Sequence, residues 1–264
     1  MSGVVPIGNW QLALAACFML AAGIASRRLR LGLTKDIAVA TLRVFLQLIA
    51  LGIVLGYVFQ YQTPWLVGAL LLVMLVSATI IARGRVKNGP SGLGPTLFIS
   101  LFVTSATVTC AVVALVVRPD PLWDARTVLT LGGMVLGNSM SAAAVALDRL
   151  YADLDTRADE ILSLTALGAT PAEAAHASMA SSIRSGMIPT LSTMCAAGLV
   201  TIPGMMSGQI LAGADPLMAA KYQIVVLLMI SAATTICNVL VVGLGYRKRF
   251  DKNGVFLEPG LRER

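Results

Sequence analysis

The chain has 264 residues, of which 57% are hydrophobic and 12% charged, and its mean hydropathy is +0.82. Soluble domains carry about 25% charged residues, so this composition excludes an ordinary soluble domain and indicates a protein of the lipid bilayer. The formal charge of +7 does not indicate a nucleic-acid partner, because the Lys and Arg residues lie at the edges of apolar runs.

Seven apolar runs predict membrane-spanning helices, so the expected fold is an all-α, polytopic membrane helix bundle. Each run has about 17–25 residues, enough for a helix to cross a hydrocarbon core of about 30 Å. The first run is followed by its positive charges, whereas residues 1–9 carry none, so we interpret it as a retained span and not as a signal peptide. The runs cover residues 10–26, 38–59, 64–82, 94–117, 128–147, 188–212 and 222–246.

The basic residues between these spans predict the orientation. One set of alternate ends holds sixteen Lys and Arg residues, whereas the other set holds Arg118, Arg126 and Lys221. Positive residues accumulate on the cytoplasmic side of membrane proteins, so we expect the N-terminus outside and the C-terminus in the cytoplasm. Residues 1–264 then form a single transmembrane domain with a cytoplasmic insert at 148–187 and a short cytoplasmic tail at 247–264.

The cytoplasmic insert predicts two short helices joined by a rigid corner. Asp155 or Thr156 can cap the first helix, and the negative charge of Glu160 in its first turn interacts favourably with the helix dipole. Gly168 is the expected end of this helix, because glycine readily adopts a positive φ. Thr170-Pro171-Ala172-Glu173 is a capping box with proline at the first helical position, so a second helix begins there.

The second helix of the insert carries unusually small side chains from Ala174 to Ser182. Such a helix can lie in a groove of another protein with little steric cost, or it can pack against its own bundle. Composition leaves both possibilities open.

Polar side chains within the spans are candidates for a translocation path. Arg43 and Gln47 stand one helical turn apart in the second span. The favoured interpretation is that Arg43 reaches the membrane interface and Gln47 bonds a neighbouring helix; the alternative is a polar lining. The same question is open for Asn138 in the fifth span and Asn238 in the seventh. The spans contain no acidic residue, which argues against an ion-coupled carrier.

The residues predict neither a metal site nor a cofactor. The four cysteines lie singly in separate apolar runs, so neither a disulfide framework nor a zinc site is indicated. Met205 and Met206 offer thioethers suited to a soft metal, but methionines in an apolar span more often pack against other helices. His176, the single histidine, lies in the insert, where we interpret it as a solvated or docking residue.

Several motifs together resemble the FetB-type permeases of ABC transporters, a family that includes a bacterial iron-export permease and plant aluminium-tolerance half-transporters. The resemblance covers about residues 36–249. The matching motifs, in chain order, are Arg43 with Gln47-Leu48, Gly137-Asn138-Ser139-Met140, Leu167-Gly168-Ala169-Thr170-Pro171, Ser182-Ile183-Arg184, Pro203-Gly204-Met205-Met206-Ser207-Gly208, Ala212-Gly213, Asp215-Pro216 and Lys221-Tyr222-Gln223-Ile224.

The resemblance implies a homodimeric permease of the inner (plasma) membrane that exports iron or another metal species. A separate ATPase subunit supplies the energy, and the chain itself is no enzyme, which agrees with its lack of a GxxxxGK[ST] phosphate-binding motif. In importers a glutamate and two alanines usually precede the coupling glycine; here they are missing, and Glu160 stands eight positions before Gly168. The alternatives are an importer-type ABC permease for a small organic solute, and a membrane receptor or scaffold without transport.

The resemblance also implies two groups of functional residues. The residues expected to couple to the ATPase are Glu160, Leu167, Gly168, Ala169, Thr170, Pro171 and Glu173. The candidates for the translocation path are Arg43, Gln47, Asn138, Met205, Met206, Ser207 and Asn238.

Overall fold

The computed structural model describes residues 8–30, 32–87, 89–251 and 254–257. Every element named within these residues is a helix, and the predicted all-α fold is confirmed. The helices are α1 (Asn9–Arg28), α2 (Thr34–Tyr61), α3 (Pro64–Arg85), α4 (Leu93–Val112) with a π-helical continuation η1 (Val113–Val117), α5 (Ala125–Thr156), α6 (Ala158–Ala166), α7 (Pro171–Ala196), α8 (Gly204–Leu211), α9 (Pro216–Gly245) and a 3-10 turn η2 (Tyr246–Arg249).

Six of the predicted spans correspond to helices that are long and apolar enough to cross a membrane. These are the first five predicted spans and the seventh. Their residues are Trp10–Arg28, Thr34–Tyr61, Pro64–Arg85, Leu93–Val117, Ala125–Thr156 and Pro216–Arg249. The assignment rests on length and composition, so the count of seven crossings and the orientation of the termini stay predictions.

The predicted sixth span, residues 188–212, is divided into two helices. α7 begins in the predicted cytoplasmic insert and continues through Pro189 to Ala196. The Ala196 carbonyl then accepts hydrogen bonds from the amides of Val200 and Thr201, at 2.9 and 3.1 Å, so the chain turns instead of continuing as a helix. α8 follows this turn. One helix therefore runs across the predicted boundary at residue 187, and the extent of the cytoplasmic insert stays a prediction.

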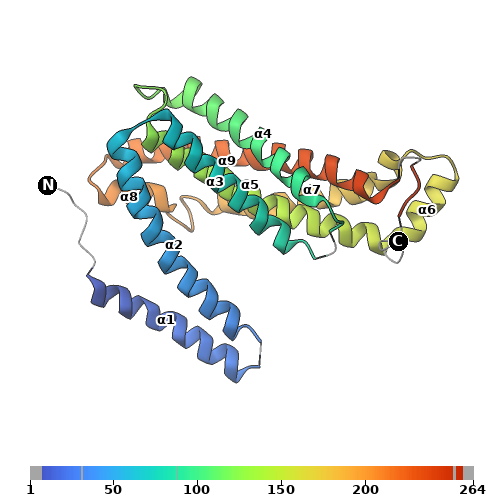
Figure 1. Ribbon diagram of the computed structural model, residues 1–264, viewed down its shortest axis with the longest axis horizontal. Coiled ribbons are helices and arrows are strands. Elements are labelled where there is room, and N and C mark those ends of the chain that lie inside the picture. The colour runs from blue at the N-terminus through green and yellow to red at the C-terminus, as the bar shows by residue number, and fades with distance from the viewer. Residues whose placement is uncertain (1–7, 31, 88, 252–253, 258–264) are drawn as a thin grey trace.

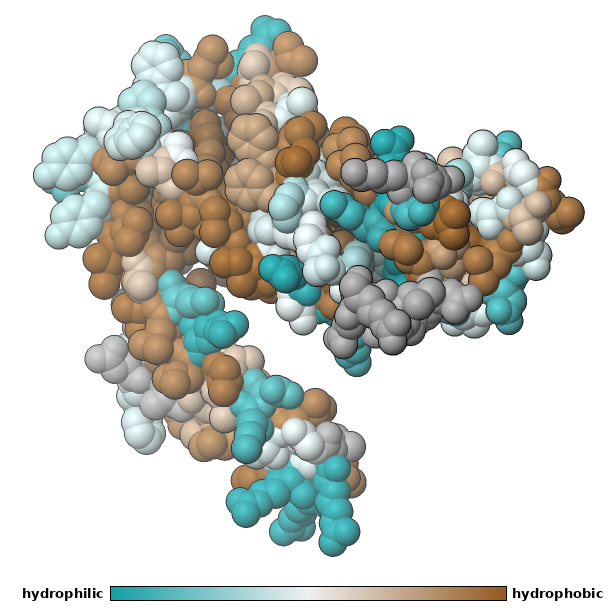
Figure 2. All heavy atoms as spheres, turned by 45° about the vertical axis from the view of Figure 1, so that its right-hand side comes forward, coloured by the Kyte–Doolittle hydropathy of each residue, from teal (hydrophilic) through white to brown (hydrophobic). Residues whose placement is uncertain are grey.

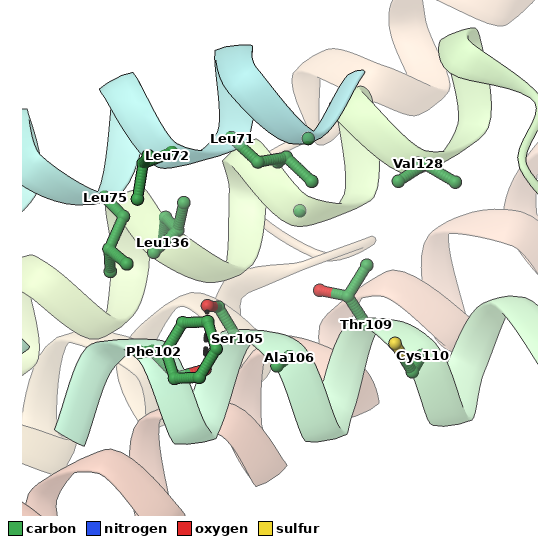
Figure 3. Close-up of a pocket in the computed structure, with 12 residues that line it drawn as sticks. Leu71, Leu72, Leu75, Phe102, Ser105, Ala106, Thr109, Cys110, Val128 and Leu136 are labelled. Carbon is green, nitrogen blue, oxygen red and sulfur yellow. Dashed lines mark hydrogen bonds between the residues drawn. The ribbon is translucent and has the colours of Figure 1, made fainter. Parts of the chain in front are cut away.

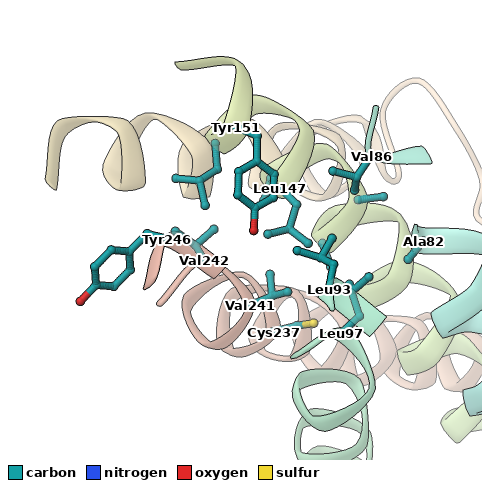
Figure 4. Packing of buried hydrophobic residues seen from close by; sticks show 14 of the residues in the cluster. Ala82, Val86, Leu93, Leu97, Leu147, Tyr151, Cys237, Val241, Val242 and Tyr246 are labelled. Carbon is teal, nitrogen blue, oxygen red and sulfur yellow. The ribbon is translucent and has the colours of Figure 1, made fainter. Parts of the chain in front are cut away.

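The centre of the bundle is formed by α5, α7 and α9, with α3 and α4 packed against them (Figure 1). Figure 4 shows Leu147 and Tyr151 of α5 facing Val241 and Val242 of α9, and all four are buried. Small residues bring these helices close together. A Cβ on Gly186 of α7 would lie 2.7 Å from Nδ2 of Asn238, so only glycine fits at this crossing.

The helices α1 and α2 form a hairpin, here called the arm, that projects away from this bundle (Figure 1). α2 reaches the bundle near its C-terminal end, where Val58 packs with Val67 of α3 and Leu129 of α5. In the most apolar window of α2, 0% of the residues are buried. Figure 2 shows apolar side chains along the arm and the bundle, with hydrophilic ones gathered at the tip where α1 meets α2.

Candidate coupling corner and translocation path

The predicted corner lies between α6 and α7, at the opposite end of the bundle from α8 (Figure 1). Gly168 has a φ of +93°. Its N–H donates to the Thr165 carbonyl and the N–H of Ala169 donates to the Leu164 carbonyl, each at 3.0 Å. These two bonds form a Schellman motif, which satisfies the last carbonyls of α6 and reverses the chain. The helix end predicted at Gly168 is present.

A capping box fixes the start of α7 two residues later. The Glu173 N–H donates to Oγ1 of Thr170 at 3.3 Å, and the Thr170 N–H donates to Oε2 of Glu173 at 2.8 Å. Pro171 occupies the first helical position, as predicted. The hydroxyl and the backbone N–H of Thr170 both donate to the carboxylate, and these bonds lower the pKa of Glu173 below its ordinary value.

The predicted cap of α6 is wrong, because Asp155 and Thr156 belong to the last turn of α5. Arg157 alone separates α5 from α6. Its Nε and Nη2 donate to the two carboxylate oxygens of Glu160 at 2.8 and 2.6 Å, which lowers the pKa of Glu160. The carboxylate of Asp155 instead pairs with Arg249, with 2.7 Å between Oδ1 and Nη2. That contact lies outside the local sequence on which the prediction depended.

The corner presents both apolar and charged groups to its surroundings. Leu167 is 86% exposed, and Glu160, Gly168, Thr170 and Glu173 are also exposed. Ala169 and Pro171 are partly buried.

The small side chains of α7 pack against the molecule's own bundle. Ala174, Ala175, Ser178 and Ser182 are all buried. His176 is exposed between them. The buried face therefore belongs to the fold, and the corner with its exposed leucine is what remains for a partner.

The seven candidates for a translocation path do not converge on one site within the described chain. Arg43 and Gln47 lie exposed on the arm, away from the bundle core. Asn238 is 0% exposed in α9, against Gly186. Neither amide atom of Asn238 has a hydrogen-bond partner among the described residues.

Asn138 lines a groove of about 170 Å³ formed by residues of α5, α7 and α9 and by Arg85 of α3. Ser141, Thr190 and Thr193 also line it, so hydroxyl and amide groups meet a single guanidinium. The sequence prediction missed Thr190 and Thr193. The two threonines follow Pro189 and stand three residues apart, which places them on one face of a helix. This spacing was the signal available in the sequence.

The three α8 candidates differ in their surroundings. Met205 packs against a buried cluster that includes Val135 of α5 and Val226 and Met229 of α9. Met206 is half-buried. The Ser207 hydroxyl donates to the Pro203 carbonyl at 3.2 Å, within the first turn of α8.

An apolar cavity of about 400 Å³ lies between α3, α4 and α5 (Figure 3). Leu71 and Leu75 of α3, Phe102 and Thr109 of α4 and Val128 of α5 line it, and none of its lining residues is charged. Such a lining suits an acyl chain better than a hydrated ion. Across the described residues, no three His, Cys, Asp or Glu side chains gather as a metal site.

Comparison with known proteins identifies relatives along almost the whole chain. The family described as "Uncharacterised protein family (UPF0014)" matches residues 9–250. The chain is 32% identical to the "Probable iron export permease protein FetB" of Escherichia coli, over 98% of both chains. It is 32% identical to the "UPF0014 membrane protein YjkA" of Bacillus subtilis, over 91% of this chain and 94% of the relative. It is 31% identical to the Arabidopsis thaliana "Protein ALUMINUM SENSITIVE 3", over 93% of this chain and 88% of the relative. No solved structure matches the chain.

Proposed function

Because the chain belongs to the UPF0014 family of membrane proteins, we propose that it is the permease subunit of an ABC transporter in the inner membrane. It exports iron or another metal species, works as a homodimer and takes its energy from a separate ATPase subunit. The observation that carries the proposal is the corner at Gly168, a rigid exposed element at one end of a membrane bundle. The metal substrate is inferred from the Escherichia coli relative, a probable iron export permease.

The corner has the properties of a docking element. Leu167 is 86% exposed at its tip, and burying one leucine side chain against a partner stabilises a complex by about 1.5–3 kcal/mol. The Schellman motif and the capping box fix the backbone on both sides of this leucine. A partner that binds here therefore loses little free energy to ordering the loop.

α7 connects the corner to the polar groove without interruption. It begins at Pro171 beside the corner and carries Thr190 and Thr193, which line the groove with Asn138. A force applied at Pro171 reaches the groove through one continuous helix. This arrangement supports transport driven from the cytoplasmic side.

Docking at the corner is tested with a matched pair of glycine variants. Gly168 and Gly213 both have a φ of +93°, and neither would bring a Cβ within 4 Å of another described residue. Gly168→Val and Gly213→Val therefore impose a similar backbone strain, about 1–3 kcal/mol. Only Gly168→Val should abolish co-purification with the ATPase, with both variants still inserted in membranes. Equal ATPase binding by both variants would contradict the docking assignment.

The transport activity is tested in cells that lack the permease and its ATPase. Deletion should raise cellular iron and lower metal tolerance, and the wild-type pair should reverse both effects. Unchanged iron content and tolerance would exclude the metal substrate while leaving ATPase docking intact. Solute uptake that depends on a periplasmic binding protein would favour an importer, and the absence of any ATPase partner would favour a receptor or scaffold.

A further inference from the structure

After α9 the chain folds back on the coupling corner. We call residues 246–251 and 254–257 the C-terminal clasp. The Leu257 N–H donates to the Arg249 carbonyl at 2.8 Å, and the Asp251 N–H donates to the Val255 carbonyl at 2.9 Å. The Val255 N–H donates to the carboxylate of Asp251 at 2.8 Å. These bonds pair residues 249–251 with residues 255–257, so the clasp is folded back on itself and is not an extended tail.

The apolar side chains of the clasp belong to the same buried cluster as the corner. Phe250 and Phe256 are 8% and 3% exposed, and their ring centroids lie 5.4 Å apart in an edge arrangement. Ile161 of α6 and Ala174 and Ala175 of α7 are buried in this cluster. The two phenylalanines therefore complete the same buried cluster to which the inner residues of the corner belong.

The clasp also meets the first residue of α7. A Cβ added to Gly254 would lie 3.3 Å from Cγ of Pro171, and the φ of Gly254 is +81°. Glycine is required here both by the backbone conformation and by the close approach.

A buried ion pair ties the clasp to the end of α5. Arg249 is 1% exposed, its Nη2 lies 2.7 Å from Oδ1 of Asp155, and its guanidinium lies 5.2 Å from the centre of the Tyr151 ring. A buried charge that loses its partner is strongly unfavourable. Separation of the clasp from α5 is therefore opposed by electrostatics as well as by apolar burial.

We propose that the C-terminal clasp is a positioning element for coupling, an inference that rests on the proposed function. α6 has nine residues, and Arg157 alone joins it to α5. The clasp adds a second connection: it continues from α9, pairs with Asp155 at the end of α5 and contacts Pro171 at the start of α7. A partner docked on the corner thus acts on α7 and α9 together, and opening the clasp leaves α7 to carry the movement without the link to the end of α9.

The functional test compares clasp variants with exposed neighbours. Phe256→Ala and Arg249→Gln remove buried contacts, whereas Val255→Ala and Arg247→Gln change exposed residues of the same segment. Each variant is reconstituted in liposomes with the ATPase and iron, and both ATP hydrolysis and iron movement are measured. The two clasp variants should bind the ATPase as wild type does. For each ATP hydrolysed, they should move at most about one fifth of the iron that wild type moves. The two exposed variants should match wild type.

A structural readout keeps the test independent of transport. Hydrogen exchange is followed at the amides of Asp251 and Leu257, which are hydrogen-bonded within the clasp, and of Ile161 in α6. Phe256→Ala should speed exchange at these amides, whereas Val255→Ala should not. If Arg249→Gln fails to accumulate, Gly254→Val takes its place, because its side chain presses on Pro171.

The outcomes separate the two proposals. Faster exchange in Phe256→Ala with unchanged iron movement per ATP overturns the clasp proposal and leaves the permease assignment standing. Fast exchange at Asp251 and Leu257 in the wild-type chain also overturns it. If the wild-type permease does not bind the ATPase, the proposed function fails and the coupling role fails with it, while hydrogen exchange still decides whether the clasp is formed.

Discussion

The arm and the coupling corner both extend from the central bundle, but the chain holds them in different ways. At the corner, a Schellman motif, a capping box, a buried ion pair and two phenylalanines fix the backbone. The arm joins the bundle near one end of α2, around Val58, and the most apolar window of α2 is 0% buried. The corner's shape is therefore set within the chain, whereas the arm's position depends on what surrounds it in the membrane. Paired substitutions of glycines, tyrosines and threonines test this contrast.

The largest contrast is expected between two glycines in helices. Gly186→Val places a side chain 2.7 Å from Nδ2 of Asn238 and 2.9 Å from the Ala142 carbonyl oxygen. Overpacking of this kind costs about 3 kcal/mol, so the variant should lose much of its thermal stability in detergent. Gly52→Val in α2 meets no described atom within 4 Å and should melt within a few degrees of wild type.

Thermal melting followed by size-exclusion chromatography measures both variants. A Gly52→Val protein as unstable as Gly186→Val would show that the arm is packed as tightly as the bundle. If Gly52→Val instead converts a dimer to a monomer without unfolding, the second copy covers the arm.

A smaller contrast is expected between two tyrosines. The hydroxyl of Tyr151 donates to the Gly245 carbonyl at 3.1 Å inside the bundle. Tyr151→Phe leaves that buried carbonyl without this donor, which costs about 1–2 kcal/mol. Tyr57 on the arm is 62% exposed, and Tyr57→Phe should change stability by less than about 0.5 kcal/mol. Equal midpoints for the two variants in chemical unfolding would contradict the contrast.

A third comparison uses two threonines that precede helices. Thr170 caps α7 through its side chain, whereas Thr63 precedes α3 without a side-chain cap among the described residues. Thr170→Ala should destabilise the start of α7 by about 1 kcal/mol, and Thr63→Ala should have little effect. Hydrogen exchange of the amides of Glu173 and of Leu66 measures each helix start. Faster exchange at both sites would show that the capping hydroxyl is not the cause.

The smallest effect is expected from pH. Hydrogen bonds from the hydroxyl and N–H of Thr170 lower the pKa of Glu173 from its ordinary value of 4.5. A lowered folded-state pKa means that the stabilisation is complete above the ordinary value and is lost as pH falls through the lowered one. The pKa of Glu173 lies below this ordinary value, so its carboxylate stays ionised between pH 8 and 6. Protonation of Glu173 should therefore not change amide exchange at the corner in that range. At lower pH, protonation of Glu173 should speed amide exchange at the corner, and Glu173→Gln should remove this acid response. A transition near neutrality that Glu173→Gln abolishes would refute the assignment.

Sequence was sufficient wherever the deciding contacts lie within one turn. Gly168 ends α6, and Thr170, Pro171 and Glu173 start α7, all through bonds between near neighbours. The same local reasoning failed at Asp155, because its carboxylate is engaged by Arg249 from the far end of the chain. Without that partner in view, an aspartate before an apolar stripe has the pattern of a helix cap.

The candidate path depended on packing that no local pattern encodes. Asn138 meets Thr190 and Thr193 across the crossing of α5 and α7, which requires both helices to be placed. Arg43 and Gln47 are polar residues within an apolar run, as Asn138 is, yet they lie exposed on the arm. The break after Ala196 likewise depends on backbone turns, and Pro189, the obvious candidate breaker, is accommodated inside α7.

The clasp also bears on how the protein is synthesised. Residues 246–257 leave the ribosome after α1 to α9 have been made. Until then, the buried cluster that contains Ile161 and Ala174 lacks Phe250 and Phe256, and Asp155 lacks Arg249. A nascent chain therefore displays an unfinished corner, and the ATPase docking proposed above would require translation to have passed Leu257. A premature stop within the clasp would yield a membrane-inserted protein with an exposed apolar patch beside the corner, a form suited to recognition by proteolytic quality control.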